Sequence, residues 1–234
     1  MNFFTLWKEQ KKLSFDDREY MYEFLRSSEA INTILHNGTE SDELDVINVL
    51  SLTSVDALID VIKATCYEEP AFTAADVPCF SMLSNGIIRL PELLEFYPDG
   101  MSFYEIGYQI KKQPNPNACV KYGENHAKLA SKLSLAVISN GKPVVVQGTS
   151  IGRILVKYTI DEKKNVLRCL LLRDPFMQYL IHHIVVEDSS YSEIVAFLKP
   201  STAYRRKTSV KQLAEFAIEG SSYTDTLKAF DWTV

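Results

Sequence analysis

The chain has 234 residues and a mass of 26.6 kDa, and 46% of its residues are hydrophobic, 11% aromatic and 24% charged. These proportions are those of an ordinary globular protein, and they exclude a disordered chain and a collagen-like chain. The length predicts one or two domains. The longest apolar runs fall far short of the ~18 residues of a membrane-spanning helix, and the N-terminus lacks the pattern of a signal peptide. We therefore expect a soluble, cytoplasmic protein that does not contact a membrane.

The net charge of −5 changes sign along the chain. Residues 1–100 contain 7 Lys and Arg against 18 Asp and Glu, whereas residues 101–234 contain 18 against 12. A sign change of this kind predicts two parts with different partners, the second of them tolerant of a polyanion. Chance clustering of solvated surface charge is the alternative explanation.

The first part of the chain is predicted to be an acidic helical module with a linker, over residues 1–86. Apolar residues recur at helical spacing in 18–26, 46–50 and 55–62. Ser28 is a candidate N-cap for a short helix that would end at Asn37-Gly38. Residues 66–86 contain Pro70, Pro78 and Gly86 without periodicity, which indicates a connecting segment.

The pattern changes at residue 87, where a first winged-helix-like unit is predicted over residues 87–160. A short helix over 89–97 precedes a capping box, Ser102-Phe-Tyr-Glu105, which begins a helix to Ile110. A loop is predicted over 113–117. A helix over 124–133 follows, and then strands over 135–138 and 144–147 joined by a tight turn at Asn140-Gly141. Three helices followed by a hairpin are typical of a winged helix-turn-helix. In this motif the second helix of the helix-turn-helix, here the helix over 124–133, enters the DNA major groove.

Residues 161–234 are predicted to repeat this order as a second winged-helix-like unit. The expected elements are a helix over 161–173, a helix that Asp174-Pro175 begins, a short helix over 190–198 and a basic helix over 201–218. The fold class is therefore mainly α with small β-hairpin wings (α+β): an N-terminal helical bundle followed by two winged helix-turn-helix-like units.

Residues on the two predicted recognition helices are the candidate DNA contacts, and Lys121 and Tyr122 lie just before the first of these helices, where a phosphate contact is expected. Arginine can bind a guanine edge or a phosphate in bidentate fashion, and basic side chains in a helix-turn-helix position favour nucleic-acid contact over a merely solvated face. The candidates of the second unit are Arg205, Arg206, Lys207, Lys211 and Thr202, and those of the first are Lys128, Lys132, Asn125 and Lys121.

Signals for catalysis or a cofactor are scarce, so no catalytic residue, metal or cofactor is predicted. The four cysteines and four histidines do not cluster at metal-ligand spacing, and the phosphate-binding and nucleophile-elbow motifs are absent from the sequence. Glu162-Lys-Lys164 has the spelling of a metal-dependent nuclease motif but falls at a predicted helix start, where acidic residues favour the helix dipole.

Four segments resemble the tandem winged-helix regions that accompany prokaryotic restriction and defence enzymes and ATPase-associated regulators: Lys121–Ala130, Gly148–Gly152, Leu170–Pro175 and Leu198–Arg206. The resemblance covers roughly residues 87–220. It implies that the chain reads double-stranded DNA, as the recognition component of a restriction-modification, defence or transcription-regulation system, beside a nuclease or ATPase domain that this chain lacks. A homodimer or a partner enzyme subunit is the expected assembly.

Two other functions remain open from the sequence. One is a divergent Mg-dependent restriction-type endonuclease, whose acidic cluster would lie in residues 40–76. The other is a protein-interaction module, in which the acidic helices contact a basic partner surface.

Overall fold

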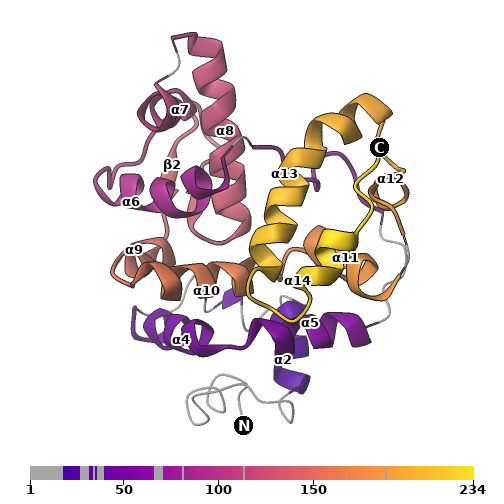
Figure 1. Ribbon diagram of the computed structural model, residues 1–234. Coiled ribbons are helices and arrows are strands. Elements are labelled where there is room, and N and C mark those ends of the chain that lie inside the picture. The colour runs from indigo at the N-terminus through magenta and orange to yellow at the C-terminus, as the bar shows by residue number, and fades with distance from the viewer. Residues whose placement is uncertain are drawn as a thin grey trace. The chain divides into compact units, whose positions relative to one another are not determined.

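The structure is a computed structural model that describes residues 18–26, 32–33, 35, 40–65, 71–80, 82–112, 114–187 and 189–234. The predicted caps at Ser28 and Asn37-Gly38 lie outside these residues. The described part is mainly helical with a small two-stranded antiparallel sheet, which confirms the predicted fold class at that level (Figure 1). Its helices are α2 (Arg18–Leu25), α4 (Glu40–Leu52), α5 (Val55–Ala64), η2 (Asn85–Arg89), α6 (Leu90–Glu95), α7 (Phe103–Lys111), α8 (Pro116–Lys132), α9 (Ser150–Val156), α10 (Ile160–Leu171), α11 (Pro175–Val186), α12 (Tyr191–Ile194), α13 (Pro200–Ile218) and α14 (Thr224–Ala229).

The chain divides into two compact units that do not follow the predicted boundaries. Unit 1 comprises the described residues within Met1–Ser28, Leu52–Cys79 and Arg168–Val234, and unit 2 those within Glu29–Ser51 and Phe80–Leu167. The described residues of the predicted acidic module, 1–86, are therefore shared between both units. A fragment that begins at Ile87 would lack part of each unit.

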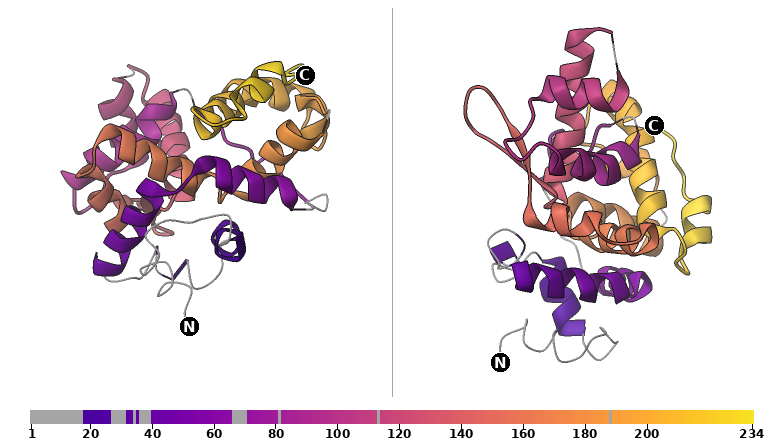
Figure 2. Two further views of the ribbon diagram at one scale, coloured as in Figure 1. Left: turned by 60° about the horizontal axis from the view of Figure 1, so that its bottom comes forward. Right: turned by 90° about the vertical axis from the view of Figure 1, so that its left-hand side faces the viewer.

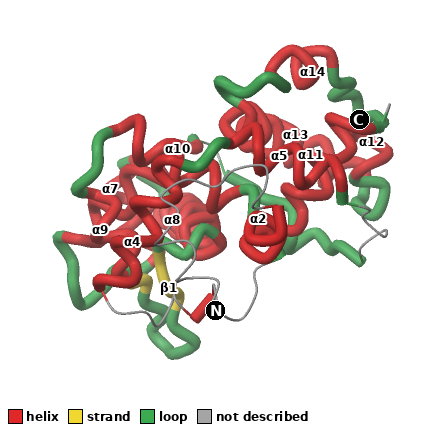
Figure 3. Tube along the Cα trace, turned by 90° about the horizontal axis from the view of Figure 1, so that it is seen from below, coloured by secondary structure: helices red, strands yellow, loops and turns green. Residues whose placement is uncertain are grey.

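In unit 2, α7 and α8 form a tightly packed helix pair that precedes a hairpin. The hairpin consists of β1 (Ala136–Ile138) and β2 (Val146–Gly148), shown in yellow in Figure 3, with Ile138 paired to Val146. Helix α8 also packs against η2, and α6 packs against α9 and β2.

The hairpin loop, residues 139–145, is wider than the predicted tight turn (Figure 2, right-hand view). A two-residue turn at Asn140-Gly141 would need positive φ angles, and among the described glycines only Gly100 and Gly220 have them. Instead, two hydrogen bonds close the base of the loop, because the Ser139 amide donates to the Val145 carbonyl and the Val145 amide donates to the Ser139 hydroxyl, each at 2.8 Å.

Helix α4 belongs to unit 2 because polar side chains from much later in the chain hold it there. The Asn165 amide group donates to the carbonyls of Leu50 and Ser51 at 2.9 and 3.1 Å, where α4 ends. The Tyr158 hydroxyl donates to Asn48 Oδ1 at 2.6 Å. The two bonds from Asn165 satisfy carbonyls that a helix end leaves without intrahelical partners.

Unit 1 is built around α11, whose packing partners include α5, α13 and α14. Buried polar side chains cover the C-terminal carbonyls of two earlier helices. Arg173 Nε donates to the Phe24 carbonyl at 3.0 Å and Gln178 Nε2 to the Leu25 carbonyl at 2.7 Å, at the end of α2. His182 Nδ1 lies 3.1 Å from the Ile62 carbonyl, near the end of α5. Helix ends that would otherwise be costly to bury are thereby satisfied.

The predicted second wing has no counterpart in unit 1. Described residues 189–234 contain α12, α13 and α14 and no strand, so a helix follows α13 where a hairpin was expected. Over the described residues, no helix is long and apolar enough to cross a lipid bilayer.

Candidate nucleic-acid interface

Local capping fixes where α7 and α8 begin. The predicted capping box of α7 is present: the Ser102 hydroxyl accepts from the Glu105 amide, and the Glu105 carboxylate accepts from the Ser102 amide at 2.7 Å. The Ser102 hydroxyl also donates to the Glu105 carboxylate at 2.8 Å, and the hydrogen bonds from the Ser102 amide and hydroxyl lower the pKa of Glu105. Helix α8 begins with Pro116, and its N-cap Asn115 accepts from the amides of Asn117 and Ala118.

The predicted start of the recognition helix at Glu124 is wrong, because α8 begins eight positions earlier. The predicted loop includes Pro114-Asn-Pro-Asn117. Asparagine is a preferred N-cap and proline is well tolerated in the first helical turn, so Asn115 and Pro116 begin α8 instead. Lys121 therefore lies inside α8 instead of before it. Tyr122, expected near a phosphate, is buried.

A close backbone approach locks α7 against α8. A Cβ atom added at Gly107 would overlap the Cys119 carbonyl oxygen, and one added at Gly123 would overlap the Phe103 carbonyl oxygen. Each helix thus contributes a glycine where the other presents backbone, which fixes their crossing point.

The hairpin is attached to the same helix pair through Met101. The Met101 amide donates to the Val146 carbonyl at 2.9 Å, and the Val146 amide donates back at 2.8 Å. Because Met101 immediately precedes the capping box, these two bonds connect β2 to the start of α7.

Five side chains of α8 share one face, which we call the α8 row: Lys121, Glu124, Asn125, Lys128 and Lys132. At about 100° per residue they fall within an arc of about 100°. The three lysines are exposed, and Glu124 and Asn125 are half-buried. Glu124 accepts a hydrogen bond from Lys121 Nζ at 2.8 Å and from Lys128 Nζ at 2.6 Å, and these two contacts lower its pKa.

The candidate residues of α13 lie in different directions. Arg205 is exposed, whereas a guanidinium NH of Arg206 donates to the Val77 carbonyl and its Nε is shielded from solvent. Lys207, half-buried like Thr202, lies with its ammonium 5.7 Å from the centre of the Tyr204 ring.

Lys211 lies about 240° around α13 from Arg205, so the two residues do not share a face. Its ammonium is 4.0 Å from the Glu215 carboxylate and 5.9 Å from the centre of the Trp232 ring. All three residues line a cavity of about 540 Å³ between α13, α14 and the segment after α14. The structure thus brings together the predicted site residues of α8 but not those of α13.

We expect Arg206→Met to lower the stability of unit 1 by about 1–2 kcal/mol, because the buried Val77 carbonyl would lose its partner. Arg205→Gln, at an exposed position, is the matched control and should change stability by less than about 0.5 kcal/mol. Thermal unfolding measures both effects. A variant of unchanged stability that loses duplex affinity would show instead that Arg206 contacts nucleic acid.

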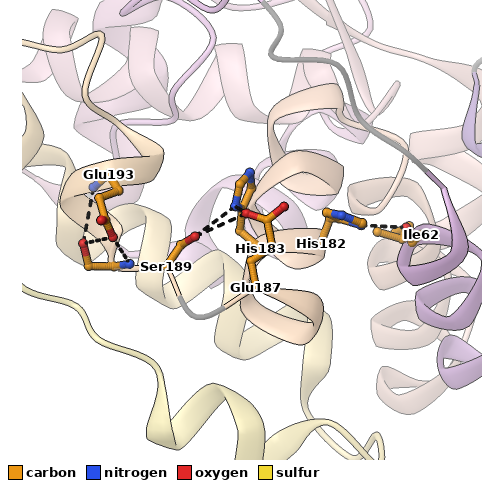
Figure 4. A network of polar contacts seen from close by, with 7 residues as sticks. Ile62, His182, His183, Glu187, Ser189 and Glu193 are labelled. Atoms are coloured by element: carbon orange, nitrogen blue, oxygen red, sulfur yellow. Dashed lines mark hydrogen bonds and ion pairs between the residues drawn. The ribbon is translucent and has the colours of Figure 1, made fainter.

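A second polar cluster lies at the end of α11 (Figure 4). His183 Nδ1 lies 2.6 Å from Glu187 Oε2 and 3.4 Å from the Ser189 hydroxyl. A serine nucleophile needs its hydroxyl on one ring nitrogen and the carboxylate on the other. Here both groups face the same nitrogen, so this geometry is not that of a catalytic triad, and the contacts hold the turn that ends α11.

The residues considered for a nuclease have structural partners instead. The Glu162 carboxylate accepts from the Thr159 amide at 3.0 Å and from the Thr159 hydroxyl at 2.6 Å, which caps the start of α10. Among the described residues, no group of three or more His, Cys, Asp and Glu side chains is arranged to hold a metal ion.

Two further basic residues of unit 2, Arg153 and Lys142, lie close to the hairpin in the sequence. The Arg153 guanidinium donates to the Gly148 carbonyl at 3.0 Å, at the end of β2. Lys142 is exposed in the hairpin loop. Lys142 was not among the predicted site residues. Its place in the predicted wing could have indicated it as a candidate DNA contact.

Comparison of the chain with protein-family models, with curated proteins and with solved structures found no significant match.

Proposed function

We propose that unit 2 binds double-stranded DNA as a winged helix-turn-helix, with α8 in the major groove and the hairpin loop beside it. The α8 row carries this proposal, because it places three exposed lysines on one face of one helix. With 17 residues, α8 is about 25 Å long, and the major groove is about 12 Å wide.

The order of elements supports the same function. Helix α6, the paired residue Met101, helices α7 and α8, and the hairpin β1–β2 follow one another as in a winged helix-turn-helix. Residues 101–157, which span these elements from Met101 onward, contain eight Lys and Arg against two Glu, a net charge of +6. A positive segment of this kind favours a polyanionic partner.

The role of the whole chain follows from this proposal together with the sequence resemblance to tandem winged-helix regions. In that role the chain is the DNA-recognition component of a restriction, defence or regulatory system, and a partner subunit carries out any catalysis. Unit 1 supports this role less directly, since α13 lacks a following hairpin and disperses its basic residues.

Neutralising the lysines of the α8 row tests the proposal. We expect the triple variant Lys121→Gln, Lys128→Gln, Lys132→Gln to weaken duplex binding strongly. If all three lysines contact phosphates, the slope of log K against log salt should flatten by up to about 2.7, at about 0.9 per contact. Mobility-shift titrations at several salt concentrations measure both quantities.

The matched control carries three neutralisations on α13: Arg205→Gln, Lys207→Gln and Lys211→Gln. It removes the same formal charge from a helix of similar length and should have the smaller effect on affinity and slope. Loss of binding in this variant, with binding retained in the α8 variant, would overturn the assignment to α8. A full-length protein that binds no duplex at low salt would overturn DNA binding itself.

A further inference from the structure

Glu124 is a carboxylate in the centre of a surface that otherwise offers positive charge. Its side chain is 22% exposed and lies between the ammonium groups of Lys121 and Lys128, which are 68% and 62% exposed. A phosphate-binding surface gains nothing from a negative charge at this position. We infer that Glu124 selects the base that α8 reads, by accepting a hydrogen bond from the exocyclic amino group of cytosine; this inference rests on the proposed function.

The two ion pairs of Glu124 are weak enough to be exchanged for contacts with DNA. Pairs at i,i+3 and i,i+4 on an exposed helix face contribute little to stability. A lysine can therefore leave Glu124 for a phosphate or a guanine edge without a large loss of stability. The carboxylate then remains on the α8 row with acceptor positions free.

Cytosine is the base whose major-groove edge fits such a carboxylate. It presents the N4 amino donor, and acidic side chains accept from this group, whereas lysine donates to O6 and N7 of guanine. Adenine also presents an amino donor, but its N7 acceptor lies beside that donor and repels a carboxylate. Lys121 and Lys128 are about 10 Å apart along the helix axis, which corresponds to about three base-pair steps of about 3.4 Å.

The carboxylate also acts against wrong sequences. Opposite a guanine O6, a thymine O4 or a phosphate it meets only acceptors, so that binding loses an interaction and adds a repulsion. Specificity by this route is expected to lower the affinity for non-cognate DNA.

Selection from a randomised duplex library, followed by titration of duplexes that differ at one base pair, tests this inference with Glu124→Gln in the full chain. We expect the unaltered protein to prefer cytosine at one position by about 5- to 100-fold. In the Glu124→Gln variant this preference should fall at least fivefold, while affinity for non-cognate duplex increases. Glu95→Gln removes a charge from an exposed position of the same unit and should leave the preference unchanged.

Two further results separate the inference from the proposed function. Replacing guanine by inosine in the selected site leaves the major-groove edge intact, so the cytosine preference should persist; its loss would overturn major-groove reading by Glu124. If Glu124→Gln raises the affinity for all duplexes equally, with the same base preference, Glu124 is only an ion-pair partner and the inference is wrong, although DNA binding stands. If the unaltered protein binds no duplex, the proposed function fails.

Discussion

Gly123→Ala is expected to destabilise unit 2 by about 2 kcal/mol or more, even though alanine is the better helix former by about 1 kcal/mol. The added methyl group would overlap the carbonyl oxygen of Phe103, and its nearest neighbours also include the Gly107 amide nitrogen at 3.0 Å. Backbone atoms cannot move aside as a side chain can, so α7 and α8 must separate. Urea denaturation followed by circular dichroism measures the loss as a lower midpoint at an unchanged slope.

Gly141→Ala is the matched control for this substitution. Among the described residues, a Cβ atom at Gly141 would have only the Pro143 carbonyl oxygen, at 4.0 Å, within 4 Å, so the same chemical change should leave stability nearly unaltered. Gly107→Ala should behave like Gly123→Ala, because its methyl group would overlap the Cys119 carbonyl oxygen. If both crossing variants unfold at the midpoint of the unaltered chain, the tight helix crossing does not exist in solution.

Sequence reasoning predicted the elements whose signals are local. The capping box at Ser102 and the N-cap at Asp174 lie where they were expected, because each depends on a side chain and an amide three residues apart. The two strands were placed to within two residues at each end. Their connecting turn was not, since the hydrogen bonds between Ser139 and Val145 select a wider loop.

The division into units could not be predicted from local patterns. It depends on side chains that satisfy backbone carbonyls more than 100 residues away, such as Asn165 at the end of α4 and Gln178 at the end of α2. A buried carbonyl at a helix end does not specify in the sequence which distant residue will bind it. Charge composition, which grouped residues 1–100 together, reports on the surface and not on such contacts.

The candidate site shows the same limit. The α8 row follows from residue spacing alone once α8 is a helix, and all its members except Glu124 were among the predicted site residues. Arg206 was grouped with Arg205 because the two are adjacent and basic, but the contact of Arg206 with the Val77 carbonyl joins residues 129 positions apart. Charge density in the sequence therefore did not reveal that Arg205 and Arg206 differ in their surroundings, with Arg205 exposed and Arg206 held by a backbone carbonyl.

His126 should make the stability of unit 2 depend on pH. Its side chain is fully buried in α8, and the centre of its ring lies 4.4 Å from the centre of the Tyr122 ring. Neither ring nitrogen has a hydrogen-bond partner among the described residues. Burial, aided by the charge of Lys111, lowers its pKa from 6.5 to about 4. In the unfolded chain the ring takes up a proton near pH 6.5, but in the folded chain only near pH 4.

As the pH falls through this window, protonation favours the unfolded state. The contribution of neutral His126 is fully present above pH 6.5 and is lost progressively toward pH 4, by about 3 kcal/mol in all. An NMR titration of the His126 ring in the folded protein should give the low pKa directly. Urea denaturation at pH 7 and pH 4.5 should show a corresponding fall in the free energy of unfolding.

His126→Leu isolates this effect, because carboxylates that titrate over the same range are common to both proteins. The variant should unfold at pH 7 with a free energy close to that of the unaltered chain, since the lost ring has no hydrogen bond to lose among the described residues. At pH 4.5 it should be the more stable of the two. His182→Leu is the contrasting control: it removes a contact with the Ile62 carbonyl, so it should destabilise unit 1 already at pH 7. Equal pH dependence of His126→Leu and the unaltered chain would mean that water or a polar group reaches the His126 ring, and that the core of unit 2 around α8 is more open than the structure shows.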